Sequence, residues 1–258
     1  MNIGERDELI FKIALVSMRD KQDSIFGNHI TSVGFMGREF RSLDANFNLS
    51  QLSWMNDIQL SIVADRLGIG KAPVGAKADV YINGVGVSLK SLQAAPAALV
   101  NHTARPGFEF ACRNAGVSIS TLDAIVDDYW DKRTSGVISE DTKISDRNCP
   151  FRPYKEYLRP ILEYFLFDGT GSKLSAAPAE YIIEFSNPLD VKTYKLLTKG
   201  DAVDEVWPKL IFSLRSKKGM PSEYNPNTYR GANAQSIKRW VQYISGDYRG
   251  ALHIRTSR

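Results

Sequence analysis

Apolar and polar residues follow one another along the chain with two different periods. An apolar residue at every third or fourth position is typical of a helix that buries one face. By this criterion we predict helices at residues 5–18, 38–47, 55–67, 120–132 and 154–167. Stretches rich in glycine, small or polar residues, at 27–37, 134–153 and 168–179, are predicted to connect these helices.

Three segments in the last third of the chain have the pattern of strands. They are EYIIEF, LIFSLRS and GALHIRTS, and in the last two apolar residues alternate with polar or basic ones. We therefore expect an α/β fold with a mixed central sheet flanked by helices, followed by a C-terminal α+β region. The change of pattern places a boundary near residue 140, so the expected domains are 1–140 and 141–258.

The composition is that of an ordinary globular protein, with 43% hydrophobic and 24% charged residues among 258. No apolar run approaches the roughly 20 residues of a bilayer span, and the N-terminus MNIGERDEL is too charged for a signal peptide. Cys112 and Cys149 are the only cysteines and lie far apart, which argues against a disulfide framework and a zinc site. We expect a protein of a reducing compartment, most simply the cytoplasm.

Positive charge is concentrated at the C-terminal end of the chain. Residues 209–258 contain ten Lys or Arg and two Asp or Glu, which gives this segment a balance of +8. The other 208 residues contain 23 basic and 27 acidic residues, a balance of −4. This asymmetry favours a C-terminal region that binds a polyanion, although a basic surface in contact with solvent alone has the same composition.

The segment KADVYINGVGVSLK, residues 77–90, carries the strongest local signal in the chain. Asn-Gly between two β-prone runs is typical of a two-residue hairpin turn of type I′, which requires positive φ at both residues. With Asn83 and Gly84 in the turn, the strands have one register. The pairs that face each other are Ile82 with Val85, Val80 with Val87, and Ala78 with Leu89. All six are apolar, so this face is predicted to be buried.

The opposite face of the predicted hairpin is polar. Its residues are Lys77, Asp79, Tyr81, Gly86, Ser88 and Lys90. Asp79 lies across from Ser88 and diagonal to Lys90, and Gly86 leaves the surface beside the charges open because it has no side chain. A cross-strand ion pair on a hairpin half in contact with solvent explains this pattern, and so does a ligand shared by Asp79 and Lys90.

This pattern resembles the core of PD-(D/E)xK nucleases, which have an aspartate at one strand and a triplet ending in lysine on the next. The wider sequence GIGKAPVGAKADVYINGVGVSLKS resembles a type II restriction endonuclease over about a tenth of the chain. The resemblance implies a restriction-endonuclease-like core. It also implies sequence-specific, Mg²⁺-dependent cleavage of double-stranded DNA, and a cognate DNA methyltransferase that protects the same site.

The resemblance assigns roles to individual residues. Asp79 would be the metal-binding carboxylate, the backbone carbonyl of Leu89 a further metal ligand, and Lys90 the motif lysine. Ser88 stands where the family usually has Asp or Glu, and Ala78 stands where it often has Pro. Since Ser88 has no carboxylate, a second acid would come from elsewhere, and we choose Glu39, on the predicted second helix, ahead of Glu109.

Phosphodiester hydrolysis suits these residue types. Mg²⁺ prefers oxygen ligands and binds few protein carboxylates, and it activates water and polarises phosphoryl oxygens. Lys90 would position or deprotonate the attacking water, or stabilise the charge of the transition state, and the sequence does not choose between these roles.

The segment from Arg215 to Trp240 combines basic residues with Asn and Gln. Arg pairs with guanine and Asn or Gln with adenine in the major groove, whereas Lys and Arg bind phosphates. We predict base contacts from Arg230, Asn233 and Gln235, and phosphate contacts from Lys217, Lys218, Lys238 and Arg239. Arg255, with His253 on the same face of the last strand, is predicted to add a basic group facing outward. An ordinary polar surface loop is the alternative for 215–240.

Two other functions fit the same residues. A repair or junction-resolving nuclease with the same core would recognise DNA structure. Base contacts from the Asn/Gln/Arg-rich segment would then be less necessary. A non-catalytic DNA-binding protein would carry Asp79 and Lys90 as a surface pair only. A homodimer and a monomer are both compatible with the sequence.

Overall fold

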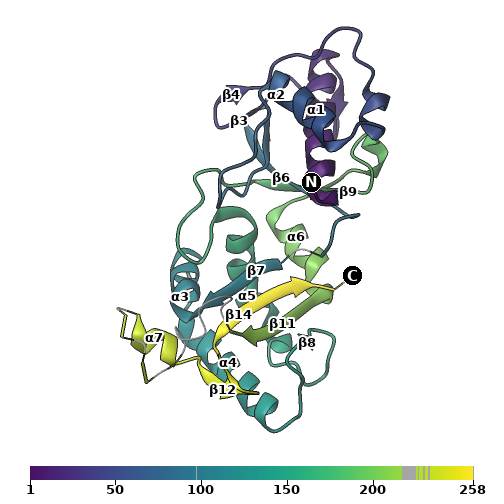
Figure 1. Cartoon of the computed structure of the whole chain (residues 1–258). Coiled ribbons are helices and arrows are strands. Elements are labelled where there is room, and N and C mark those ends of the chain that lie inside the picture. Colours follow the sequence, from purple (N-terminus) through teal and green to yellow (C-terminus); the bar gives the residue numbers. More distant parts are fainter. Residues whose placement is uncertain (97, 217–224, 226, 229, 232, 258) are drawn as a thin grey trace. The chain divides into compact units, whose positions relative to one another are not determined.

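The computed structural model divides the chain into two compact units, each made of two chain segments (Figure 1). Unit 1 comprises Met1–Ala95 and Ser175–Lys199, and unit 2 comprises Pro96–Leu174 and Gly200–Arg258. The structure describes all residues except 97, 217–224, 226, 229, 232 and 258. The boundary expected between residues 140 and 141 therefore lies within unit 2, because the chain leaves unit 1 near residue 95 and returns to it at residue 175.

Unit 1 is built on a six-stranded sheet with the strand order β10-β9-β6-β5-β3-β4. The strands are β3 (Val33–Phe35), β4 (Arg38–Glu39), β5 (Val80–Ile82), β6 (Val85–Ser91), β9 (Tyr181–Phe185) and β10 (Lys195–Leu197). β6 and β9 are parallel and all other neighbours are antiparallel, so the sheet is mixed. A small hairpin of β1 (Ser24–Ile25) and β2 (Asn28–His29) completes the strands of this unit.

Helix α1 (Ile3–Asp20) packs on one face of the sheet of unit 1, and α2 (Asp57–Leu67), preceded by the 3₁₀ helix Leu49–Ser53, packs against α1. Both begin with a capping box, Asn2 with Glu5 and Asn56 with Gln59, which satisfies the first free backbone N–H groups. The apolar side of α1 joins the core made by Val33, Val80, Val87, Leu89, Ile183 and Phe185. One sheet face is therefore the core, and the other holds the polar side of the hairpin.

Unit 2 contains a four-stranded antiparallel sheet with the order β7-β14-β11-β8. Its strands are β7 (Ala98–Ala104), β8 (Thr142–Lys143), β11 (Leu210–Arg215) and β14 (Ala251–Thr256), and β12 (Gln242–Ile244) with β13 (Asp247–Arg249) forms a separate hairpin. Its helices are α3 (Arg105–Asn114), α4 (Ile119–Thr134), α5 (Lys155–Glu163) and α7 (Ala234–Lys238), while α6 (Lys199–Val206) begins at the end of unit 1. Short 3₁₀ helices lie at Arg152–Tyr154 and Trp207–Lys209 in unit 2 and at Val191–Thr193 in unit 1, and the π-helix Tyr164–Asp168 extends α5.

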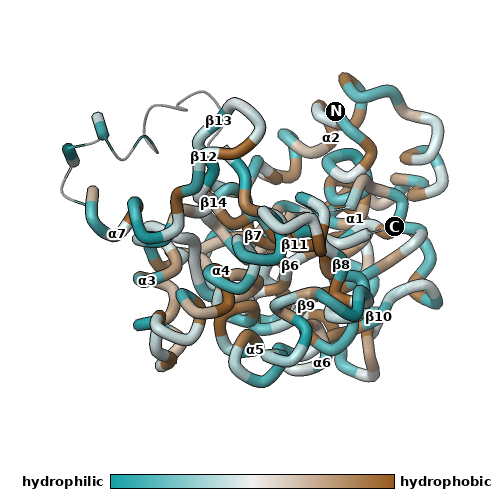
Figure 2. The backbone as a smooth tube through the Cα atoms, turned by 90° about the horizontal axis from the view of Figure 1, so that it is seen from below, coloured by the Kyte–Doolittle hydropathy of each residue, from teal (hydrophilic) through white to brown (hydrophobic). Residues whose placement is uncertain are grey.

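The core of unit 2 is rich in aromatic side chains. Phe151 stacks on Phe212 with ring centroids 4.2 Å apart, and Phe108 packs against Trp240 at 5.4 Å. Hydrophobic and hydrophilic positions interchange along the strands and helices, as expected for elements that bury one side (Figure 2). The whole protein is thus a mixed α/β protein with helices against its sheets, as the sequence predicts. None of the described helices is long and apolar enough to cross a bilayer.

The predicted helix at 38–47 is the clear error of the sequence analysis. These residues form β4 and an irregular segment, although Phe40, Leu43 and Phe47 have helical spacing. The N–H of Phe40 donates to the carbonyl of Val33 (2.9 Å), and that of Leu43 donates to the Asp20 carboxylate (2.9 Å). Tertiary hydrogen bonds therefore override a weak local helical pattern.

Candidate functional site

The hairpin predicted at 77–90 is present, with the expected turn. Ile82 pairs with Val85 and Val80 with Val87, and both turn residues have positive φ, 52° for Asn83 and 82° for Gly84. The third predicted pair, Ala78 with Leu89, is absent because β5 begins only at Val80. The backbone turns away at this point, since the N–H groups of Lys77 and Ala78 both donate to the carbonyl of Ala177 (2.9 Å).

Asp79 occupies the position where the two strands separate. Its N–H still donates to the Val87 carbonyl (2.8 Å), but its carboxylate turns to the neighbouring strand. Asp79 Oδ2 accepts hydrogen bonds from the N–H of Leu89 (2.7 Å) and the hydroxyl of Ser88 (3.1 Å). On the β5 side of β6, no strand is paired beyond Val87, and the Asp79 side chain takes the place of the missing backbone acceptor. Both donors to Asp79, the N–H of Leu89 and the hydroxyl of Ser88, are neutral groups.

The polar face beside Asp79 is closed at Gly86, where the sequence predicts an open surface. A Cβ on Gly86 would lie 2.4 Å from the carbonyl oxygen of Pro178 and 3.3 Å from the Cβ of Ala78. The segment before β9 is held there by the N–H of Glu180, which donates to the Gly86 carbonyl (2.7 Å). Gly86 is therefore needed for close approach of backbone, and Ala78 lies on this face instead of opposite Leu89.

Lys90 lies at the exposed end of this face, beside an acid that the sequence analysis missed. In the parallel pairing of β6 with β9, Lys90 is the register partner of Glu184, so both side chains point to the same side of the sheet. Lys195 of β10 pairs with Glu184 from the other side. The only sequence signal for Glu184 was its position inside the strand-like EYIIEF, because the β6–β9 pairing joins residues 94 positions apart.

Helix α1 fixes the end of β6 just beyond Lys90. The hydroxyl of Ser91 donates to Asp7 Oδ2 at 2.5 Å, and α1 packs on β6 over its apolar face. This contact holds the backbone of the strand that carries Ser88 and Lys90.

Of the two acids proposed to replace the missing carboxylate, only Glu39 belongs to unit 1, and it does not lie next to Asp79. Glu39 is exposed on the edge strand β4, separated from β6 by β3 and β5, which at about 4.8 Å per strand is roughly 14 Å between backbones. Glu109 belongs to α3 of unit 2, where it contacts Arg105 and Ser236. Glu184 is the acid that the sheet brings closest in register to the motif lysine.

The oxygen atoms around Asp79 fit a hard divalent cation in part. The N–H and C=O of a strand residue point to the same side, so the Leu89 carbonyl faces the side on which its N–H meets Asp79. Mg²⁺ often uses one or two protein carboxylates and takes its other ligands from water and substrate. Across the described residues, no cluster of three or more His, Cys, Asp or Glu side chains forms a complete metal site.

The cysteines offer no alternative chemistry. Both are buried, and burial raises the pKa of each thiol to about 11, so they are neutral near pH 7.

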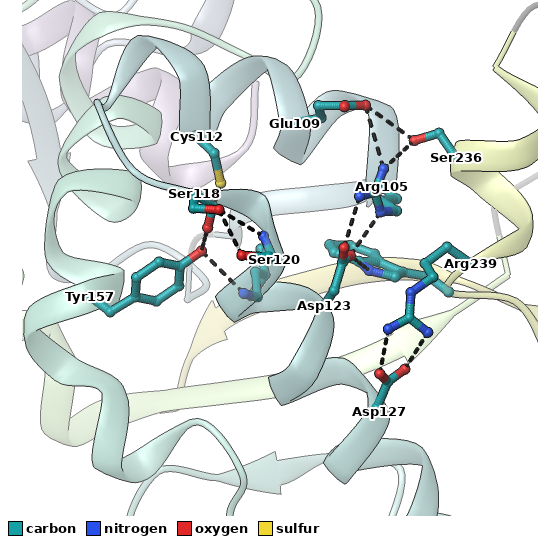
Figure 3. Close-up of polar contacts among 12 residues, drawn as sticks. Arg105, Glu109, Cys112, Ser118, Ser120, Asp123, Asp127, Tyr157, Ser236 and Arg239 are labelled. Carbon is teal, nitrogen blue, oxygen red and sulfur yellow. Dashed lines mark hydrogen bonds and ion pairs between the residues drawn. The ribbon is translucent and has the colours of Figure 1, made fainter.

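The segment predicted to read DNA is anchored to unit 2 through α7 (Figure 3). Arg105 of α3 donates to Ser236 of α7 at 2.7 Å and forms two hydrogen bonds to Asp123 of α4, at 2.7 and 2.8 Å. The indole N–H of Trp240, just after α7, donates to the same Asp123 (2.7 Å). Burial by itself would raise the pKa of Asp123, but these hydrogen bonds outweigh it and lower the pKa below the usual value.

This anchoring leaves one side of α7 exposed. Asn233, at its N-terminus, and Gln235 are exposed, as is Arg230, while Lys238 is half-buried. Arg239 forms a bidentate ion pair with Asp127 of α4, at 2.9 and 2.5 Å, so its charge is compensated within the unit (Figure 3). Lys217 and Lys218 lie outside the described residues.

The prediction that His253 faces outward is wrong. His253 is only 7% exposed on β14, because its ring packs on that of His102 with centroids 4.7 Å apart. Burial, followed by the neighbouring His102 and arginines, lowers the pKa of His253 to about 4. Arg255 is half-buried and pairs with Asp141 (2.9 Å), which also binds Arg215 (2.8 Å), so it is not an isolated outward charge.

No protein-family model, curated protein or solved structure matches this chain.

Proposed function

We propose that this protein is a Mg²⁺-dependent endonuclease that cleaves double-stranded DNA at specific sequences, with Asp79 and Lys90 at its active site. The observation that carries the proposal is the carboxylate of Asp79, just before β5, which accepts a hydrogen bond from the N–H of Leu89, the residue before Lys90. The strand order also supports it. A hairpin that joins a parallel strand inside a mixed sheet, with α1 on the other face, accords with a restriction-endonuclease-like core.

In this proposal different residues of unit 1 bind the metal ion and stabilise the transition state. Bound Mg²⁺ would polarise a phosphoryl oxygen and lower the pKa of a water molecule. Asp79 and the Leu89 carbonyl would hold the ion, while Ser88 keeps the Asp79 carboxylate in one orientation through its hydroxyl. Lys90, exposed at the end of β6, would stabilise the charge that develops on the phosphate.

We further propose Glu184 as the acid that compensates for Ser88. Its register places it beside Lys90, where a carboxylate would bind the ion or hold the lysine in position. Glu39 does not receive this role, because it lies three strands away on the sheet.

Recognition of DNA is assigned to unit 2. The exposed Arg230, Asn233 and Gln235 are the side-chain types that pair with bases, and Lys238 with Lys217, Lys218, Arg239 and Arg255 would bind phosphates. On binding DNA, Arg239 would leave Asp127 and Arg255 would leave Asp141 to contact phosphates. The free-energy cost is small, because such partly exposed ion pairs contribute only about 0–1 kcal/mol to stability. A restriction function also implies a methyltransferase that modifies the same site.

The test is incubation of the full chain with plasmid and genomic DNA, with Mg²⁺ or with chelator. Discrete fragments are expected with Mg²⁺ only, and Lys90→Ala should cut on the order of 10³-fold more slowly. Lys71→Ala is the matched control, since Lys71 is an exposed lysine of unit 1 paired with Glu5. Cleavage by Lys90→Ala at the wild-type rate contradicts the assignment of the active site.

A non-catalytic DNA-binding protein is the second candidate, because the two hydrogen bonds of Asp79 also suit a purely structural cap on β6. In that case Asp79→Asn and Lys90→Ala bind DNA like the wild type, and no metal produces strand breaks. Gel-shift assays beside the cleavage assay separate the two functions.

A further inference from the structure

Three arginines of unit 2 converge on two adjacent acids. The arginines are Arg215 at the end of β11, Arg249 of β13 and Arg255 of β14. The acids are Glu140 and Asp141, which directly precede β8. Asp141 binds Arg215 with one carboxylate oxygen (2.8 Å) and Arg255 with the other (2.9 Å). Glu140 binds Arg249, so these five side chains form one cluster with one positive charge more than negative.

The arginines of β11 and β14 extend from the polar face of the four-stranded sheet. Ser213 pairs with His253, and Arg215 and Arg255 each lie two residues further along these strands, so all four side chains share one face. The opposite face joins the aromatic core through Phe212, Leu214, Leu252 and Ile254. Arg215 and Arg255 are only partly buried, so a ligand from solvent reaches them.

This cluster contains hydrogen-bonding groups that the two acids do not satisfy. Among the described residues, the buried side-chain nitrogens without a hydrogen-bond partner are Arg249 Nε and His253 Nδ1. His253 is 7% exposed and lies close enough to Arg215, Arg255 and Asp141 for their charges to act on its ring. The Nε of arginine is always a donor, and a phosphate offers it more acceptor oxygens than a carboxylate does.

The backbone of the two acids is held by groups other than the arginines. The buried hydroxyl of Tyr129 donates to the Glu140 carbonyl (2.9 Å), and the hydroxyl of Ser139 donates to the Asp141 carbonyl (2.8 Å). The hydroxyl of Thr142 donates to the Ser139 carbonyl (3.0 Å). The carboxylates therefore leave the arginines by side-chain rotation alone, while the backbone stays in place.

The exposure of the two acids makes their ion pairs open to competition. The side chain of Asp141 is 41% exposed and that of Glu140 is 36% exposed, and partly exposed pairs contribute little to stability. DNA of any sequence attracts arginines through its phosphates, whereas a specific site adds base contacts. Carboxylates on the arginines thus weaken binding to any sequence, and base contacts at the specific site compensate for their displacement.

We propose that Glu140 and Asp141 are specificity-determining residues, which cover Arg215, Arg249 and Arg255 until the phosphates of the specific DNA site displace them. Arg215 and Arg249 thereby join Arg255 as residues that bind phosphate. This role rests on the proposed function only in that unit 2 binds DNA, and it requires no cleavage.

Binding of the full chain to a labelled duplex of random sequence, with chelator to prevent cleavage, tests this role. Glu140→Gln combined with Asp141→Asn should bind on the order of tenfold more tightly than the wild type, because three arginines are released to phosphates. The salt dependence of log K should steepen by about 0.9 for each new phosphate contact. The amides keep the shape of the carboxylates, so the fold should persist, which circular dichroism checks.

Glu156→Gln combined with Asp204→Asn is the matched control. These two acids of unit 2 bind Lys155 and Arg159, so the control removes the same charge and also releases cations. It should gain much less affinity than the first double variant. Equal gains overturn the proposal, because net charge alone would then explain the result. Adding Arg215→Ala and Arg249→Ala to the first double variant should remove its gain.

A duplex that carries the site mapped from cleavage fragments measures specificity. The double variant of Glu140 and Asp141 should gain less affinity for this duplex than for random sequence, so the ratio of the two affinities falls. Equal gains on both duplexes, or no gain on random sequence, overturn the proposal.

The cleavage assay separates this role from the nuclease assignment. A wild type that cleaves DNA beside a double variant without any gain contradicts the role of Glu140 and Asp141 alone. A wild type that does not cleave, beside a double variant that binds random DNA more tightly, contradicts the nuclease and supports the covering of the arginines.

Discussion

Asp123 in unit 2 and Asp79 in unit 1 both accept several hydrogen bonds, but from different kinds of donor. Asp123 is 8% exposed and receives a bidentate arginine and an indole N–H, so its charge is neutralised where it lies. Asp79 is half-buried and receives a hydroxyl and a backbone amide, which hold its orientation without cancelling its charge. A carboxylate of the first kind stabilises a fold, whereas one of the second kind has the uncompensated charge that the proposed binding of a cation requires.

The largest expected loss of stability comes from removing the buried hydrogen bonds of Asp123 with Arg105 and Trp240 in unit 2. Asp123→Ala removes the closer carboxylate partner of the buried Arg105 guanidinium and leaves Glu109 at 3.5 Å, and removal of one partner of a buried pair costs about 3–5 kcal/mol. Urea unfolding should show this loss as a lower transition midpoint. Asp79→Ala is the comparison in unit 1, and it should lose only about 1–2 kcal/mol, because the partner left behind is an amide.

Equal losses in the two variants contradict the comparison, since Asp79 would then be as important to the fold as Asp123. A loss of activity without a large loss of stability is expected for Asp79→Ala alone.

A second prediction concerns the closed side of the candidate active site. Gly86→Ala places a Cβ 2.4 Å from the Pro178 carbonyl oxygen, and this backbone must shift at a cost on the order of 3 kcal/mol. Thermal unfolding should show a lower melting temperature. Gly200→Ala in α6 is the matched control, because no atom lies within 4 Å of its added Cβ and the helix prefers alanine. Equal melting temperatures for the two variants contradict the closed geometry.

The smallest effect is a pH dependence in unit 2. The pKa of His253 is about 4 in the folded protein, below its ordinary value of 6.5, so folding favours the neutral ring. The contribution of His253 to the free energy of unfolding is therefore fully present above pH 6.5 and is lost as the pH falls toward 4. Between pH 8 and pH 5 this lowers the free energy of unfolding by about 2 kcal/mol. His102, Arg215 and Arg255 oppose protonation, while Asp141 favours it.

His253→Phe keeps an aromatic ring against His102 and should remove this part of the acid sensitivity. The measurement is the difference in unfolding free energy between variant and wild type at the two pH values, which cancels the titration of all other groups. A difference that does not change with pH contradicts the buried neutral state of His253.

The sequence by itself determined the elements whose interactions are local. The Asn83-Gly84 turn set the register of β5 with β6, and the apolar periods located α1, α2, α4 and α5 within a few residues. The same local pattern predicted that the polar face of the hairpin carries Asp79, Ser88 and Lys90, because a hairpin register determines which side chains share a face.

Only the tertiary structure decided what depends on distant pairing. The parallel contact of β6 with β9 brings Glu184 beside Lys90 across an inserted unit, and no local period encodes that register. His253 alternates as an exposed strand residue would, yet His102 covers it. Glu39 lies in a strand because hydrogen bonds from neighbouring segments outweigh the helical spacing around it. Local rules fix backbone geometry over a few residues, whereas burial and charge pairing depend on which distant segments meet.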